Sequence, residues 1–388
     1  MQYITDPKSG NELSILGFGC MRFPRDKTKT EQLILTAVDA GVNYFDTAYI
    51  YPGSETTLGE IIYKNGLREK IRLATKLPYR KCAVTDDFEK FFQKQTERLK
   101  TDFIDYYLIH GITELDEWRR LCEMGIEGWI SGKKKSGQVR QIGFSFHGAQ
   151  NEFLSILDAY DWDFCQIQYN YMDENYQAGK AGLQKANQKG IPVIIMEPLL
   201  GGKLASGLPR KAERLFREAD QNSTPASFAF RWLWNQPEVT VVLSGMNSAS
   251  QLEENLKTAS DAKPGMLSYA QSAVFGPVLD AFKESYKVPC TGCNYCMPCT
   301  NGVNIPGCFS AYNTSYAMGF IQGFIQYLTS TGSNRRKKHN RAGNCVGCGV
   351  CEKSCPQKIR ISKSLTDVKK RMEPFWFGAV IKILQKFT

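Results

Sequence analysis

The chain has 388 residues, more than a single domain usually contains, and 42% of them are hydrophobic, which is enough to bury a sizeable core. No apolar run approaches the roughly 20 residues that cross a bilayer, so we exclude a membrane span. The N-terminal residues are polar, and no apolar segment typical of a signal peptide follows them. We therefore expect a cytoplasmic protein.

The net charge of +10 is concentrated in the C-terminal part of the chain. From Gly276 onward 16 Lys and Arg residues stand against 5 Asp and Glu residues, which leaves 33 against 34 before it. The basic run of Arg335, Arg336, Lys337 and Lys338 lacks interleaved aromatic residues. We interpret it as a solvated loop, or one that faces an acidic partner, and expect no nucleic acid.

The cysteines are distributed just as unevenly. Nine of the 13 fall between Cys290 and Cys355. In a reducing compartment such clustering is more typical of metal ligation or redox chemistry than of disulfides. This change of composition predicts two domains, one over residues 1–275 and one over residues 276–388.

Eight β-rich runs alternate with helical patterns over the first 260 residues, which is typical of βα units and a parallel sheet. An open doubly wound sheet would normally carry a GxGxxG turn after its first strand, but Gly17-Phe18-Gly19 is followed by Cys-Met-Arg. We therefore predict an α/β fold, a closed (β/α)8 TIM barrel. The expected strands are Ile15–Gly19, Asn43–Asp46, Ile71–Lys76, Ile104–His110, Gln141–Ser145, Phe164–Tyr169, Val193–Met196 and Thr240–Ser244.

Amphipathic periodicity predicts helices between several of these strands. Asp86 followed by Glu89 approximates a capping box at the start of one of them. Beyond the barrel we expect a linker with a helix over Asp261–Val288, and a tail at Phe375–Leu384 that packs on the barrel or contacts a membrane surface or a partner. The expected helices are Glu31–Ala40, Ser54–Asn65, Asp86–Leu99, Ser250–Thr258 and a stretch within Tyr312–Tyr327.

Four polar residues stand at or just after the carboxyl ends of successive strands, where barrel enzymes place their chemistry. Asp46 and Tyr51 occur in FDTAYIYPGSE, Lys76 in LATKLP and His110 in DYYLIHG. A phenol with a pKa of about 10 is a weak acid near neutrality, whereas a lysine about 4 Å away would favour the phenolate by roughly 4 kcal/mol at an effective dielectric of 20. Such a tyrosine can donate and accept a proton.

The identity, order and spacing of these four residues resemble the catalytic tetrad of the aldo-keto reductase family, and LKTDFIDYYLIHG resembles the family's pattern before its histidine. The resemblance implies reversible hydride transfer between a nicotinamide and a carbonyl. It assigns proton transfer to Tyr51, support of Lys76 to Asp46, and orientation of the carbonyl to His110. His147, in GFSFHG, is a further residue placed to face this site.

The same resemblance implies a set of cofactor contacts. Ser145 and Gln166 match positions that bind the nicotinamide carboxamide, although Phe146 replaces the family's usual Asn. Met196 replaces the aromatic residue that stacks on the nicotinamide. Gly245, Glu254 and Asn255 match the segment that binds the adenosine half. Asn247 stands where many members have an arginine for the 2′-phosphate, which favours NADH over NADPH.

The C-terminal cysteines match iron-sulfur spacing. Cys345, Cys348, Cys351 and Cys355, followed by Pro356, form the C-x2-C-x2-C-x3-C-P run of bacterial ferredoxins. The first run has only two residues between its third and fourth cysteines, where the ferredoxin pattern has three. Eight thiolates suffice for two 4Fe-4S clusters, and Cys308 is left over as a buried small residue. The first run comprises Cys290, Cys293, Cys296 and Cys299.

The ferredoxin pattern also implies which cysteines share a cluster. In ferredoxins the fourth cysteine of a run ligates the other cluster. Cys355 would then complete the cluster of the first run, and Cys299 that of the second run. The shorter spacing before Cys299, with Pro298, leaves open the alternative that the loop of Cys299 closes on its own cluster. We expect a small α+β ferredoxin-like domain around both clusters.

Together these features predict an NAD(P)H-dependent oxidoreductase of a carbonyl or related small-molecule substrate, with two 4Fe-4S clusters for electron transfer and a possible redox partner protein. Two alternatives remain open. The barrel could be the scaffold of an electron-transfer or redox-sensing subunit, or the clusters could be structural parts of a simple reductase. A hydride carries two electrons and each cluster one, so coupling them would need a flavin or a radical-tolerant substrate.

Overall fold

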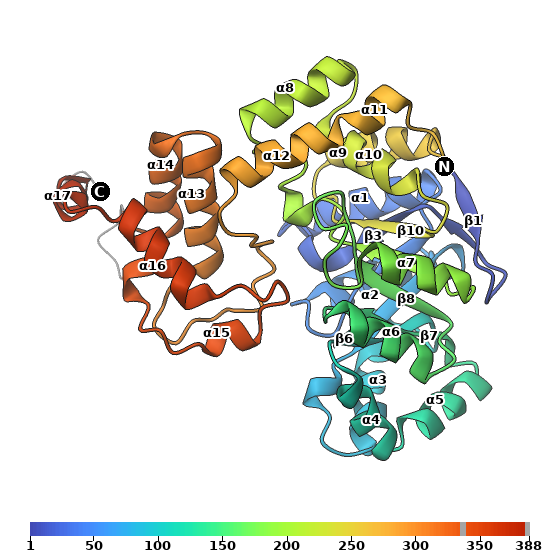
Figure 1. The fold of residues 1–388 in the computed structure, drawn as a ribbon. Coiled ribbons are helices and arrows are strands. Elements are labelled where there is room, and N and C mark those ends of the chain that lie inside the picture. The colour runs from blue at the N-terminus through green and yellow to red at the C-terminus, as the bar shows by residue number, and fades with distance from the viewer. Residues whose placement is uncertain (334–338, 385–388) are drawn as a thin grey trace. The chain divides into compact units, whose positions relative to one another are not determined.

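The computed structural model describes residues 1–333 and 339–384, so the basic run at 335–338 lies outside the described residues (Figure 1). Contacts between residues divide the chain into two compact units. Unit 1 comprises 1–198 and 229–267, and unit 2 comprises 199–228 and 268–388. The domain boundary near residue 275 stays a prediction, because contacts alone do not define separately folding domains.

Unit 1 contains a closed barrel of eight parallel strands in the order β10-β3-β4-β5-β6-β7-β8-β9, which confirms the predicted (β/α)8 architecture. All eight predicted runs form strands, with ends shifted by no more than two residues. The strands are β3 Leu16–Gly19, β4 Tyr44–Asp46, β5 Arg72–Leu77, β6 Ile104–Ile112, β7 Val139–Phe146, β8 Phe164–Gln168, β9 Val193–Met196 and β10 Val241–Ser244.

An antiparallel hairpin that the sequence analysis missed, β1 Tyr3–Thr5 with β2 Glu12–Ser14, precedes the barrel. Leu13 of β2 joins the buried core inside the barrel, and Asp6 accepts a 2.7 Å hydrogen bond from the Tyr106 hydroxyl. Strands of three residues carry too little alternation to be detected. The other core residues are Tyr44, Ala74, Tyr106, Leu108, Phe164, Ile194, Val241 and Leu243.

Helices follow the strands of unit 1. Gly59 lets two of them approach closely, because a Cβ atom there would lie 2.2 Å from the Arg98 carbonyl oxygen. The capping box predicted at Asp86 was wrong: the N-cap is Thr85, whose side chain makes no capping bond. Its hydroxyl donates to the Met124 carbonyl instead. The helices are α1 Lys27–Asp39, α2 Ser54–Lys64, α3 Asp86–Leu99, α4 Leu115–Glu123, α5 Ile126–Lys135, α6 Gln150–Ala159, α7 Gly179–Gln188 and α10 Ala249–Ser260. Helix α9 Pro225–Trp234 crosses from unit 2 into unit 1.

Unit 2 is built from helices and loops, and its described residues form no strand, unlike the α+β domain expected from the sequence. The stretch predicted within Tyr312–Tyr327 is two helices, separated at Gly319, whose positive φ of 108° ends the helical path. The helices are α8 Arg210–Ala219, α11 Tyr269–Ala273, α12 Phe275–Ser285, α13 Ile305–Ala317, α14 Phe320–Ser330, α15 Val350–Lys353, α16 Ile361–Met372 and α17 Phe377–Leu384.

The core of unit 2 lies among α13, α14 and α16, the orange to red helices of Figure 1. Phe377 and Ile381 of α17 are buried in it, so the tail packs within this unit, whereas the sequence favoured packing on the barrel. Half-buried cysteines of both runs pack against the same core. None of the helices in 1–333 and 339–384 is both long and apolar enough to cross a membrane.

Candidate functional site

A buried ion pair lies where two neighbouring barrel strands end. Asp46 is the last residue of β4, and Lys76 is the next to last of β5. The Lys76 ammonium donates to both carboxylate oxygens of Asp46 at 2.6 Å and to the Thr47 carbonyl at 2.8 Å. Both side chains are buried. Burial raises the pKa of Asp46, and the charge and hydrogen bonds of Lys76 oppose the shift.

The predicted tyrosine and histidine lie beside this pair. Tyr51 occupies the turn between β4 and α2, and the Lys76 ammonium is 5.4 Å from its ring centroid. The ring of His110, in β6, meets the Tyr51 ring edge-on with 6.0 Å between centroids. The structure therefore brings together all four residues of the predicted tetrad. A cation this close to the phenol favours its ionised form.

His110 is uncharged at neutral pH. Burial lowers its pKa well below the usual range, and the nearby Lys76, His147 and Arg80 act in the same direction. Its Nδ1 atom is buried and has no hydrogen-bond partner in the part of the chain that the structure describes. A neutral imidazole still carries one N–H group, so His110 can donate a hydrogen bond to a bound oxygen without adding charge.

A row of hydrogen-bonded polar side chains begins at His147, and only this first member was expected from the sequence. His147 lies immediately after β7, and its Nδ1 is 3.2 Å from Oε1 of Gln177. Gln177 donates to Gln168, the last residue of β8, at 2.9 Å. Burial lowers the pKa of His147 to about 4, although the Gln177 hydrogen bond opposes the shift. Gln177 was missed because it lies in an irregular loop.

Arg80 was also missed. It follows β5 and donates to the Gly111 carbonyl at 3.0 Å and to Glu117 at 3.1 Å. Its place in a loop after the carboxyl end of a barrel strand is the signal that could have found it.

The predicted nicotinamide contacts lie on three adjacent strands. Ser145 of β7 is in register with Gln166 of β8, and Met196 ends β9 half-buried. The Ser145 hydroxyl accepts a 2.7 Å bond from the Gly111 amide, which leaves its own hydrogen available. Oε1 of Gln166 is buried and lacks a hydrogen-bond partner among the described residues. An orphaned acceptor beside a hydroxyl donor fits a carboxamide group.

The predicted adenosine contacts follow β10. Gly245 and Asn247 are exposed. The backbone N–H of Asn247 donates to the Gln251 side chain at 3.0 Å. Glu254 is half-buried on α10. Asn255 is buried and donates to Ser244 at 3.0 Å, so its side chain also anchors the helix to the end of the strand.

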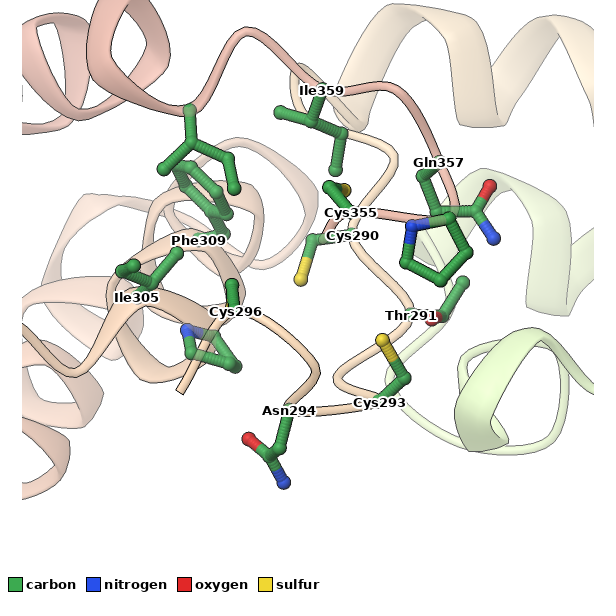
Figure 2. Close-up of a pocket in the computed structure, with 13 residues that line it drawn as sticks. Cys290, Thr291, Cys293, Asn294, Cys296, Ile305, Phe309, Cys355, Gln357 and Ile359 are labelled. Atoms are coloured by element: carbon green, nitrogen blue, oxygen red, sulfur yellow. The ribbon is translucent and has the colours of Figure 1, made fainter. Parts of the chain in front are cut away.

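Four cysteines in unit 2 surround one cavity. Cys290, Cys293 and Cys296 of the first run line it together with Cys355 of the second run (Figure 2). Burial raises the pKa of Cys296 to about 12, and the other three thiols raise it further. Other lining residues include Thr291, Ile305, Phe309, Ile359 and Ile361. Thiols in an apolar pocket fit an iron-sulfur cluster.

The other four cysteines of the two runs are Cys299, Cys345, Cys348 and Cys351. Burial raises the pKa of Cys351, and both Cys299 and Cys345 contribute in the same direction. Cys348 is exposed on the same loop. Cys308 is buried in the core between α13 and its neighbours. Within the described ranges no three Cys, His, Asp or Glu side chains converge on one point as ligands of a single metal ion.

Comparison with known proteins agrees with this geometry. The profile of the aldo/keto reductase family matches residues 15–263, and that of a 4Fe-4S dicluster domain matches residues 289–360. An aldo-keto reductase of Mycolicibacterium vanbaalenii is 29% identical over 258 residues, which cover 63% of this chain and 82% of that protein. A 6-dehydroglucose reductase of Novosphingobium aromaticivorans is 28% identical over 275 residues, covering 63% and 86%.

Among solved structures, the holo form of an aldo-keto reductase from Bacillus halodurans superposes with a TM-score of 0.60 at 24% identity. The match covers 72% of this chain and 96% of that one. At this identity the likeness shows the fold.

We expect His147 to make unit 1 sensitive to acid. Its folded-state pKa of about 4 lies below the ordinary value of 6.5, so between these values the unfolded chain binds a proton that the folded chain does not. Stability should therefore fall as the pH drops through this window, by roughly 3 kcal/mol for this residue, and be unaffected by it above the window.

Replacing His147 by Gln removes this titration, so the stability difference between wild type and H147Q should change by that amount between pH 7 and about pH 4. Urea unfolding followed by tryptophan fluorescence measures it, because five of the six tryptophans lie in unit 1: Trp118, Trp129, Trp162, Trp232 and Trp234. His339→Gln, in unit 2, is the matched control. Parallel pH profiles for wild type and H147Q would contradict the assignment.

Proposed function

The chain belongs to the aldo/keto reductase family, and we propose that it reduces the carbonyl or a related group of a small molecule with NAD(P)H, while its dicluster domain exchanges electrons with a partner protein. The convergence of Asp46, Lys76, Tyr51 and His110 at the ends of barrel strands carries this proposal. As an aldo-keto reductase with a 4Fe-4S dicluster domain, the protein is an oxidoreductase. We propose that it works in the cytoplasm, where a reducing environment preserves its thiols.

We propose separate tasks for the four residues. Tyr51 gives its hydroxyl proton to the carbonyl oxygen as that oxygen gains negative charge. Lys76 stabilises the phenolate that remains, and Asp46 keeps the lysine charged and in place. His110, being neutral, orients the carbonyl by a hydrogen bond and does not compete with Tyr51 as an acid. A nicotinamide, when bound, supplies the hydride.

For the cofactor we propose Ser145, Gln166 and Met196 at the nicotinamide, and the segment from Gly245 to Asn255 at the adenosine half. The orphaned acceptor of Gln166 supports the first set. Asn247 is exposed and uncharged, and it offers no charge-assisted bond to a 2′-phosphate. We therefore favour NADH over NADPH.

For the clusters we propose that all eight cysteines of the two runs are ligands and that the fourth cysteine of each run is exchanged. The shared cavity of Cys355 with Cys290, Cys293 and Cys296 supports one half of this arrangement. The contributions of Cys299 and Cys345 to the raised pKa of Cys351 support the other half. The clusters, when bound, supply single-electron transfer.

The first prediction from this proposal concerns Tyr51. Tyr51→Phe removes the proton donor, so the rate of carbonyl reduction should fall at least about 100-fold, whereas cofactor affinity and iron content should not change. The measurement is turnover of a panel of aldehydes and ketones with NADH and NADPH. Tyr63→Phe is the matched control, because Tyr63 is 70% exposed on α2. Near-full activity of Tyr51→Phe would favour a barrel that serves as the scaffold of a redox subunit.

The nucleotide preference gives the second prediction. Isothermal titration should show that NADH binds at least as tightly as NADPH. Asn247→Arg should strengthen NADPH binding about tenfold or more, because a charge-assisted bond contributes roughly 1.5–3 kcal/mol. NADH binding to the same variant is the internal control and should not improve. A wild-type preference for NADPH would show that another basic residue contacts the phosphate.

Ligand exchange between the runs gives the third prediction, which pairs of alanine substitutions test. If Cys355 serves the first cluster, Cys290→Ala with Cys355→Ala should remove one cluster, leaving about four of about eight irons. Cys345→Ala with Cys355→Ala should remove both. Cys308→Ala, which removes the ninth cysteine of the module, should keep all the iron. The reverse result for the two double variants would show that Cys355 binds beside Cys351.

A further inference from the structure

The segment that follows β9 packs against the first cysteine loop within unit 2. It begins at Leu199, three residues after Met196. Gly201 in this segment has a φ of +69°, and a Cβ atom there would lie 2.0 Å from the Thr291 carbonyl oxygen. The two backbones therefore touch at a point that admits only glycine. A loop that leaves the end of a barrel strand is thus fitted to the residue beside Cys290.

Lys203 of the same segment places a positive charge on this loop. Its ammonium donates to the Cys290 carbonyl and is 5.4 Å from the ring centroid of Tyr286. A cation close to a redox centre stabilises whichever oxidation state is more negative. For a cluster on Cys290 that is the reduced state.

Thr291 provides a second group that acts in the same direction. Its side chain lines the cavity with Cys290, Cys293, Cys296 and Cys355 (Figure 2). It is only 4% exposed, and its Oγ1 has no hydrogen-bond partner within 1–333 and 339–384. A buried hydroxyl without a partner is costly and calls for an explanation. A cluster sulfur in the cavity would accept its hydrogen, and hydrogen bonds to cluster sulfurs are among the features that set the reduction potential.

The other four cysteines of the two runs are more exposed to solvent at one of their members. Cys348 is exposed, and its neighbours Val346 and Val350 are 69% and 59% exposed. Solvent exposure is another determinant of the potential. Among the eight cysteines of the two runs, Cys290 of the first run is buried and Cys348 of the second is exposed, so the two cluster sites differ in burial.

We propose that Lys203 and Thr291 raise the reduction potential of the cluster on the first cysteine loop above that of the cluster on the second run. This inference rests on the proposed cluster ligation. When the pair of clusters holds one electron, that electron resides on the first cluster. The loop after β9 thereby sets the order of potentials in a module to which it does not belong by sequence.

The test is an equilibrium redox titration of the whole protein, followed by electron paramagnetic resonance. Lys203→Met removes the charge, and Thr291→Val removes the hydroxyl with little change of shape. Each should shift the more positive of the two midpoints to a lower potential and leave the other unchanged. Lys203→Arg should keep the wild-type midpoint. Lys211→Met is the matched control, because Lys211 lies in the same segment and pairs with Glu284 at the surface.

Each outcome decides the proposal. A shift of the same midpoint in both variants, with none in Lys211→Met, supports it. Unchanged midpoints, shifts of different midpoints, or equal shifts in Lys203→Met and Lys203→Arg overturn it. Where Lys203→Met loses iron, the shift in Thr291→Val decides. Iron analysis distinguishes the two failures. Eight irons with unchanged midpoints overturn only this inference, whereas a wild-type protein without two clusters overturns the proposed function.

Discussion

Lys76 and Asp46 form an ion pair inside the barrel, and both side chains are almost fully buried. Burying two charges is costly, and removing one partner of such a pair typically costs about 3–5 kcal/mol, because it leaves the other charge buried alone. The three hydrogen bonds of the ammonium offset the loss of hydration. The same charge lies beside the Tyr51 ring and lowers the pKa of His110. The acid-base properties of the site therefore depend on this pair together with burial.

The cysteine loops of unit 2 have little regular structure of their own, so other parts of the unit must fix their backbone. Its helices supply a polar clamp for the second run. The Tyr327 hydroxyl donates to Glu373 at 2.6 Å and accepts from the Ala342 amide, and Gly343 donates to the same carboxylate. The backbone just before Cys345 is thereby fixed from α14 and the end of α16. Such preorganisation lets thiols be presented before a cluster is bound.

The sequence predicted those features whose patterns lie within a short stretch of residues. The barrel strands and both cysteine runs were found because their patterns are local and repeated. The four tetrad residues were predicted from their place at strand ends and from the family resemblance, and the structure brings them together. The contact between Gly201 and Thr291 could not be predicted from the sequence, because nothing near Gly201 indicates which distant backbone segment approaches it. The helical character of unit 2 was missed for a related reason: the ferredoxin spacing describes the ligands and carries no information about the chain between the runs.

The positive charge of the protein is concentrated in the part of the chain that carries both proposed cluster sites. Residues from Gly276 onward carry a net +11, the difference between 16 and 5, and all the rest of the chain carries −1. Two clusters with their thiolates would bring about four negative charges, and each added electron one more. A basic surrounding favours reduction of both clusters alike, so it cannot by itself distinguish them. The distinction must come from groups that touch one cluster site and not the other, which is the position that Lys203 and Thr291 hold beside Cys290.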